Sequence, residues 1–281
     1  MRAPLDRLPR VCYNKLIRSD KEALHVYSFL HDLLKDKKGG DIFTLFGAWH
    51  FFYIALTIAL IVTVLILHKN KSADAKEKVP RLFLNLAFGF YVADFFLMPL
   101  AYGEIDIEKL PFHACTAMCV MCFLSYRIRF LKRFRAGLVL LGLLSNLVYL
   151  IYPAGVMWHA VHPLSYRVIQ TLLFHALMTV YGVLVVAYEH GIFDVKKCYR
   201  DLTVILCMTL WALLGNYVYN GTSATYSHFF NWFFVVRDPF YAIPASVAPF
   251  VMPLLNVAVF FAAELLLHVL ISRIKRHKTA S

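Results

Sequence analysis

The run from Phe43 to Leu67 reads FTLFGAWHFFYIALTIALIVTVLIL and contains no Lys, Arg, Asp or Glu. A helix that crosses a bilayer needs about 20 mostly apolar residues, and this run is long enough. Further apolar runs follow it, so the sequence predicts an all-α polytopic membrane protein with about seven transmembrane helices. The predicted spans are Phe43–Leu67, Leu82–Tyr102, Leu110–Tyr126, Ala136–Tyr152, Val168–Tyr188, Leu202–Tyr219 and Ser246–Ile271.

The composition of the whole chain agrees with this prediction. Of its 281 residues, 60% are hydrophobic and 16% are charged, whereas soluble proteins carry about 25% charged residues. The net charge of +12 comes mainly from Lys and Arg outside the apolar runs, which is the ordinary pattern of membrane proteins. We therefore expect no nucleic acid among its partners. The polar first 40 residues also lack the features of a cleavable signal peptide.

The chain divides into three parts. Residues 1–41 form a polar, basic N-terminal segment, in which Lys21–Leu34 has apolar residues at helical spacing and predicts an interfacial amphipathic helix. Residues 42–272 form the membrane domain, and 273–281 form a basic cytoplasmic tail. Within the membrane domain, the aromatic-rich stretch 220–244 is interpreted as a luminal hairpin, a re-entrant segment or an interfacial lid.

The distribution of Lys and Arg predicts the orientation. Four connections are rich in basic residues and the other three carry one each, Lys109, Arg167 and Arg237, so the basic connections are expected in the cytoplasm. The N-terminal segment disagrees, because it would lie outside although it is basic. We expect the plasma membrane in a bacterium, or an endomembrane in a eukaryote. The basic connections are Lys69–Arg81, Arg127–Arg135, Lys196–Arg200 and Arg273–Lys278.

Six polar side chains on six different predicted spans fall at a similar depth. At a rise of 1.5 Å per residue, each lies roughly 5–12 Å from the membrane face opposite the basic connections. Ionisable groups inside a membrane are costly and mark functional sites, so the set favours a polar cavity. For any single residue, the competing interpretation is a hydrogen bond that fixes helix packing. The six residues are His50, Asp94, Cys115, Asn146, His175 and Asn216.

The chemistry predicted for this layer centres on Cys115. A thiol near the start of a helix lies at the positive end of the helix dipole, which favours the thiolate. His113 or His175 could act as its base, which gives the nucleophile, base and orienting group of cysteine acyl enzymes. The candidates for the orienting group are Asp94, Asn146 and Asn216.

Two other groupings receive simpler interpretations. Cys115, Cys119 and Cys122 have the spacing of an iron–sulfur motif, but they lie in one continuous apolar helix, so we expect no metal and no cofactor. Glu264 and His268 lie four residues apart at the opposite end of the seventh span, where we expect a local pair.

Three short motifs carry a resemblance to a known family. Leu110-Pro111-Phe112-His113-Ala114-Cys115 resembles the Leu-Pro-x-His-x-Cys signature of YwaF-type integral membrane proteins. Phe174-His175-Ala176 and Asn216-Tyr217 fall where that family has its His and Asn. Asp238-Pro239-Phe240-Tyr241 is similar to the Asp-Pro-Phe-Tyr of the related animal transmembrane acyltransferases.

The resemblance implies a seven-span enzyme that transfers fatty acyl chains onto ether lysophospholipids with a Cys nucleophile and a His. By position these are Cys115 and His175, with His113 as the alternative base. The implied partners are membrane lipids, namely a lysophospholipid and an acyl donor. In the animal branch the Cys follows the Pro directly, whereas three residues intervene here. The residues implied at the rim of the substrate cavity are Arg237, Asp238 and Tyr241.

Two classes of function therefore compete. The first is a membrane lipid acyltransferase, or an acyl hydrolase with the same covalent intermediate. The second is a non-enzymatic seven-span receptor or carrier, although carriers often show inverted repeats and the sequence shows none. For the enzyme, we expect the Cys115 sulfur and a His175 ring nitrogen within about 6 Å.

Overall fold

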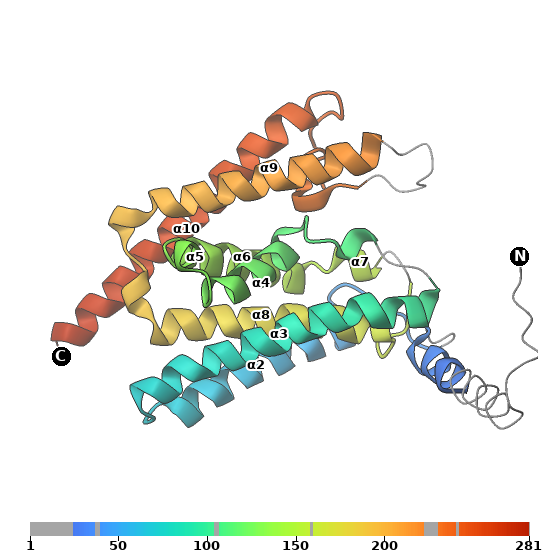
Figure 1. Cartoon of the computed structure of the whole chain (residues 1–281), viewed down its shortest axis with the longest axis horizontal. Helices are drawn as coiled ribbons and strands as arrows, with labels where there is room; N and C mark the ends of the chain where they lie inside the picture. The colour runs from blue at the N-terminus through green and yellow to red at the C-terminus, as the bar shows by residue number, and fades with distance from the viewer. Residues whose placement is uncertain are drawn as a thin grey trace, which may run out of the picture.

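A computed structural model describes residues 25–36, 40–103, 107–157, 160–221, 230–239 and 242–280. Within these ranges the chain is helical and contains no strand. Six of its helices are long and apolar enough to cross a membrane, and they run along one common direction (Figure 1). They are α2 (Ala48–His68), α3 (Ala73–Tyr102), α6 (Arg135–Ile151), α8 (Tyr166–Tyr188), α9 (Tyr199–Gly221) and α10 (Ala248–Ala280).

The predicted third span corresponds to a shorter helix, α4 (Ala114–Ser125), of 12 residues. Such a helix is about 18 Å long, whereas the hydrocarbon core is about 30 Å thick, so seven full-length spans are not confirmed. Leu110 and Pro111 form a turn, and the helix starts only after His113, whose backbone is extended. The chain still passes from one end of the bundle towards the other through α4 and α5 (Arg129–Lys132) before α6 returns (Figure 1).

Two helix boundaries extend beyond the predicted spans. Helix α3 starts at Ala73 rather than Leu82, because the Ser72 hydroxyl accepts the Ala75 N–H at 3.3 Å and caps the helix. Helix α10 continues to Ala280, through most of the predicted tail. Basic segments that the sequence assigned to a loop and a tail are therefore helical extensions of the spans.

The N-terminal part of the chain is described in part. Residues 25–34 are helical, and Val26, Phe29 and Leu33 are exposed. The first four residues of the predicted amphipathic helix, 21–24, lie outside the described residues. An interfacial position of this helix therefore stays a prediction.

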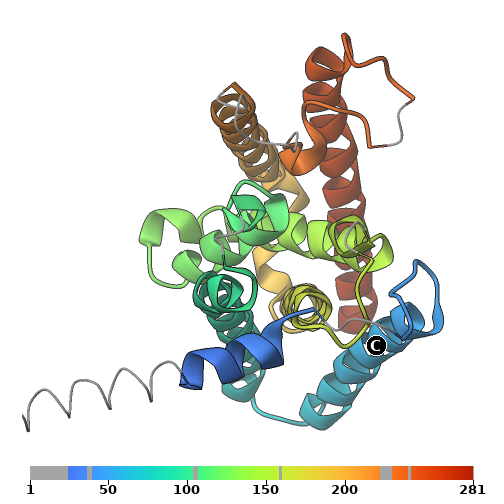
Figure 2. The ribbon, with the colours of Figure 1, turned by 90° about the vertical axis from the view of Figure 1, so that its right-hand side faces the viewer.

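Helix α8 forms the centre of the bundle, with α3 and α6 beside it (Figure 2). Most of its spanning segment is buried, in contrast to the outer helices α2 and α10. Glycine allows α6 to approach its neighbours closely. A Cβ at Gly182 would lie 2.8 Å from Leu143, and a Cβ at Gly137 would lie 2.8 Å from the Cα of Asp201. Small residues at such contacts are typical of helix packing in membranes.

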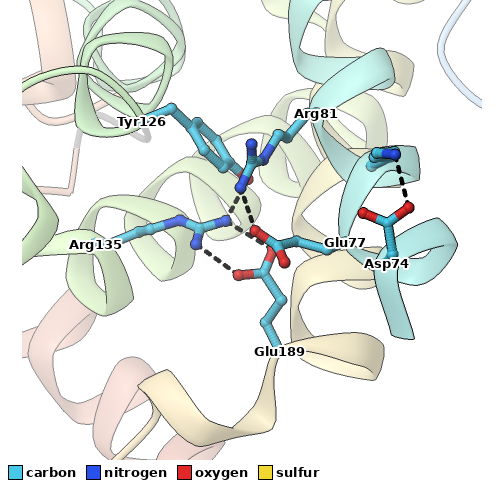
Figure 3. Close-up of polar contacts among 7 residues, drawn as sticks. Asp74, Glu77, Arg81, Tyr126, Arg135 and Glu189 are labelled. Atoms are coloured by element: carbon cyan, nitrogen blue, oxygen red, sulfur yellow. Dashed lines mark hydrogen bonds and ion pairs between the residues drawn. The ribbon is translucent and has the colours of Figure 1, made fainter. Parts of the chain in front are cut away.

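The basic connections gather at one end of the bundle, as the alternation of Lys and Arg predicts (Figure 1). At this end Arg135 pairs with Glu189, with 2.5 Å between Nη1 and Oε2, and also donates to the Tyr126 hydroxyl (Figure 3). Arg81 lies over the Tyr126 ring, 4.7 Å from its centroid, and pairs with Glu77. This charged group ties α3, α6 and the end of α4 to the residue that follows α8.

The aromatic-rich segment folds back onto the bundle. Residues 230–239 include the short helix η5 (Trp232–Phe234), and Trp232 is almost fully buried. The Asn216 side chain accepts the Trp232 N–H at 2.9 Å and donates to the Trp232 carbonyl at 3.0 Å. Asn220 bonds both backbone groups of Phe230 in the same way. The described part of the stretch therefore packs against α9 instead of projecting from it.

Candidate functional site

A buried ion pair lies near the end of the bundle opposite the basic connections. The Lys109 Nζ lies 3.1 Å from Asp94 Oδ2, and the other Asp94 oxygen accepts the Tyr166 hydroxyl at 2.8 Å. Lys109 also donates to Gln170 at 3.1 Å and to Thr171 at 3.4 Å. Because Asp94 is 1% exposed, the ammonium group neutralises a carboxylate that would otherwise be costly to bury. The cluster joins α3 and α8.

His175 lies one helical turn after Thr171 and is 4% exposed. Its Nδ1 lies 2.7 Å from the Thr171 carbonyl oxygen, which can only accept, so Nδ1 carries the hydrogen. In the neutral ring Nε2 then holds a lone pair. Within the described residues, Nε2 has no hydrogen-bond partner. The ring stacks on Tyr149, with centroids 3.8 Å apart, so its orientation is fixed.

Cys115 is the second residue of α4 and is half-buried. It lies within electrostatic range of Lys109, and so does His175. The thiol and the imidazole therefore share one charged neighbour. The sulfur does not hydrogen-bond to Nε2 of His175, since that atom has no partner in the described part of the chain. The expected separation within about 6 Å stays a prediction.

His113 lies just before α4 and stays the alternative base. Its Nδ1 is 3.5 Å from the Phe233 N–H, a long hydrogen bond, and its ring is within electrostatic range of Lys109 and His175. The same residue therefore links the start of α4 to the folded-back segment and stands two positions from the thiol.

Two members of the predicted polar layer have hydrogen bonds that hold the backbone. His50 Nδ1 accepts the Phe46 N–H at 3.0 Å, and its Nε2 donates to the Leu150 carbonyl at 2.8 Å. The Asn216 side-chain amide donates to the Trp232 carbonyl and accepts the Trp232 N–H. For His50 and Asn216 the geometry favours helix packing, which is the competing interpretation of the sequence.

The remaining candidates for an orienting group differ from each other. Asp94 is occupied by Tyr166 and Lys109. Asn146 is fully buried on α6, where its Nδ2 donates to the Gly142 carbonyl at 2.7 Å and its Oδ1 has no partner among the described residues. The group that orients His175 is instead the Thr171 carbonyl, a backbone atom of the same helix.

The predicted rim residues lie in the folded-back segment and after it. Arg237 is exposed. The Asp238 carboxylate accepts the N–H groups of Ala242 at 2.7 Å and Ile243 at 2.9 Å, which closes a turn. Tyr241 lies outside the described residues. A position at the rim of a cavity stays a prediction for all three.

Sequence reasoning missed Lys109, Gln170 and Thr171. In the sequence Lys109 serves only to predict the orientation of a loop. It is, however, the one basic residue in the short connection between the spans that carry Asp94 and Cys115. That position was the available signal. Gln170 and Thr171 stand just before His175 in an otherwise apolar helix, and they offered a weaker signal of the same kind.

The other two cysteines of α4 are core residues. Cys119 and Cys122 are both 0% exposed and pack within the main hydrophobic core. Among the described residues, no group of three or more His, Cys, Asp or Glu side chains is arranged to hold a metal ion.

No family model, no curated protein and no solved structure matches the chain.

Proposed function

We propose that the protein is a membrane-embedded lipid acyltransferase that carries the acyl chain on Cys115 and uses His175 as general base. The observation that carries the proposal is the state of His175. It is a buried imidazole with Nδ1–H bonded to a carbonyl and a lone pair on Nε2 that has no partner in the described part of the chain. A base in a membrane has to be held neutral and oriented in this way before it can accept a proton.

The position of Cys115 at the start of α4 supports the same proposal. Helix α4 starts one residue before it, so its sulfur lies beside backbone N–H groups that lack helical partners. Their partial positive charge favours the thiolate. Burial of the thiol opposes its ionisation more strongly than these groups and the nearby Lys109 ammonium favour it, so a base has to take the proton as the sulfur attacks. A half-buried thiol is also accessible to a lipid chain, whereas Cys119 and Cys122 are not.

The reaction proceeds in two balanced steps. The Cys115 thiol gives its proton to His175 Nε2, and the sulfur attacks the ester carbonyl of the donor lipid. The C–O bond breaks, a thioester forms, and the leaving oxygen takes the proton from His175. In the second step the hydroxyl of a lysophospholipid gives its proton to Nε2 and its oxygen attacks the thioester. The C–S bond breaks, and the sulfur recovers the proton. Water in place of the lysophospholipid gives the hydrolase.

The test measures acyl exchange in a lipid mixture by mass spectrometry, with an isotope-labelled lysophospholipid. Cys115→Ser should lower the rate by orders of magnitude, because a serine hydroxyl is far less ionised than a thiol. His175→Gln should lower it by about 100-fold or more. The double variant should be little worse than either single one, because the two residues act as a unit.

Cys119→Ser and Cys122→Ser are the matched controls, since both lie on the same helix outside the proposed chemistry. They should keep most of the activity. If Cys115→Ser stays fully active while His113→Gln is inactive, the assignment of the nucleophile is wrong. If wild type exchanges no acyl chain, the proposed function itself fails.

A carrier is the second candidate, and one observation favours it. Three buried ionisable residues, Asp201, Glu264 and His268, lie towards the opposite end of the bundle from Lys109, and acyl transfer has no use for them. Iodoacetamide labelling separates the two functions. An acyl enzyme should be modified at Cys115 faster than at Cys198, which is also partly exposed, and His175→Gln should remove the difference. A carrier should show no such preference.

A further inference from the structure

A second ionisable cluster lies between α9 and α10, apart from the candidate site. Asp201 is 2% exposed, Glu264 is 0% exposed and His268 is 1% exposed. His268 Nε2 forms a short contact with Asp201 Oδ2. The cluster is covered by Phe193, whose ring meets that of His268, and by Gly137 of α6, which packs directly on Asp201. The local pair of Glu264 with His268 that the sequence predicts does not form a hydrogen bond in the structure, and His268 instead contacts Asp201 of α9.

Glu264 is the unusual member of this cluster. In the described part of the chain, neither of its carboxyl oxygens has a hydrogen-bond partner. The carboxyl also lies within electrostatic range of Asp201. An ionised Glu264 would place a second carboxylate beside that of Asp201, and within the described residues no hydrogen bond to either Glu264 oxygen stabilises the charge. Burial makes such a charge costly, and a buried group in this position takes up a proton instead.

Among the described residues, no Lys or Arg forms an ion pair with Asp201 or Glu264, and the nearby basic residues have contacts elsewhere. On α6 the nearest ionisable residue, Arg135, is paired with Glu189. The short helix η4 (Val195–Lys197) packs on α10, but Lys197 pairs with Asp194 at 3.3 Å. On α9, Arg200 donates to the Arg133 carbonyl at 3.2 Å. Helix η5, which also contacts α10, contains only Trp232, Phe233 and Phe234.

We propose that Glu264, His268 and Asp201 form a proton-binding site in which Glu264 holds a proton beside the hydrogen-bonded Asp201 and His268 side chains. Loss of this proton places two carboxylates together between α9 and α10 and weakens the packing of the two helices. The ligand is a proton rather than a metal ion, because the donor groups of the described residues do not converge as metal ligands do. The site is independent of acyl transfer, since none of its residues belongs to the candidate site.

Infrared spectroscopy of the full chain in lipid nanodiscs tests the proposal. At neutral pH wild type should show the carbonyl stretch of a protonated carboxylic acid, and this band should shift in D2O. Glu264→Gln should remove the whole band. Glu77→Gln is the matched control, because Glu77 is half-exposed and paired with Arg81, and it should leave the band unchanged.

A pH titration of wild type gives a second measurement that needs no variant. As the pH rises above the usual carboxyl range, the melting temperature should fall, because the unfolded chain has released the Glu264 proton while the folded chain still holds it. The fall should end over the pH interval in which the band disappears. Glu264→Gln should lack this fall. The absence of the band at neutral pH overturns the proposal, and so does a band that survives Glu264→Gln or that disappears without any fall in melting temperature. Where Glu264→Gln does not fold, the wild-type titration decides alone.

Discussion

Lys109 shows how a single side chain can hold a site together in a membrane protein. Its backbone carbonyl accepts the Tyr91 hydroxyl at 3.0 Å, and its ammonium group reaches Asp94 on α3 and Gln170 on α8. Removing one partner of a buried ion pair leaves the other charge without compensation, which costs more than the pair itself contributes.

Lys109→Met should therefore destabilise the protein by about 3 kcal/mol. This value is at the lower end for the loss of one partner of a buried ion pair, because the Lys109 side chain is 20% exposed. Unfolding in mixed detergent micelles measures the free energy. Lys132→Met, at an exposed position, is the control and should change it by less than about 0.5 kcal/mol.

The double variant Lys109→Met, Asp94→Asn should recover part of the loss, because the carboxylate that Lys109→Met leaves unpaired is then neutral. A double variant that is less stable than the sum of its single variants would contradict a dominant role for charge at this position.

At the scale of the elements, a close approach at a glycine decides how the turn before α4 packs on α9. Gly215 on α9 faces Phe112, and a Cβ there would lie 2.4 Å from the ring. The ring is held between Trp211 and Trp232, each with its centroid 4.9 Å from that of Phe112. Trp211 also donates to the Pro111 carbonyl at 2.7 Å, so the turn before α4 is fixed and Phe112 has little room to move.

Gly215→Ala should therefore destabilise the protein by about 1–3 kcal/mol through overpacking. Gly89→Ala is the matched control on α3, where a Cβ meets nothing within 4 Å. In a helix interior this change should be neutral or stabilising by up to about 1 kcal/mol. Equal effects of the two substitutions in the same unfolding measurement would show that Phe112 does not pack on α9 as described.

The charged group at the opposite end of the bundle offers a test of coupling between α6 and the end of α8. Arg135 and Glu189 are 13% and 12% exposed, and their contact is shown in Figure 3. A double-mutant cycle with Arg135→Met and Glu189→Gln should give a coupling free energy of about 2 kcal/mol. A value near zero would mean that the pair is screened as an exposed salt bridge is.

The topology of the whole molecule depends on the short helix α4. The test uses single cysteines at positions 71 and 132, in a chain from which the six native cysteines have been removed. Position 71 precedes α3 and position 132 follows α4, so together they report whether the chain crosses and returns between them. Both should react with an impermeant reagent only from the cytoplasm, because both lie in basic connections. A cysteine at Leu164, in the short connection before α8, should react only from the opposite side.

Reaction of positions 71 and 132 from opposite sides would mean that α4 and its flanking turns do not carry the chain across. Reaction of both from the outside would reverse the orientation but leave the alternation intact.

Periodicity and composition determined the helical class, and they predicted the six helices that are long and apolar enough to cross a membrane. Long runs such as Phe43–Leu67 have only one way to satisfy their backbone groups in lipid, so local sequence is sufficient to predict a helix. The alternation of Lys and Arg likewise predicted which connections share one end. The span that contains Cys115 was predicted too long. Its residues are apolar from Leu110 onward, but the turn at Pro111 delays the start of helix α4 to Ala114.

Depth along each span can also be predicted from the sequence, which put polar groups such as His175 and Asp94 in one layer. In the structure both of these side chains are buried. Their partners were not predictable, because a hydrogen bond between helices depends on rotation about each helix axis and on neighbours far away in the chain. Only the tertiary structure showed that Asn216 holds Trp232, that Lys109 neutralises Asp94, and that Asp201 meets His268. The depth of a side chain along its span depends on its position in the sequence, whereas its hydrogen-bond partner depends on how the helices pack.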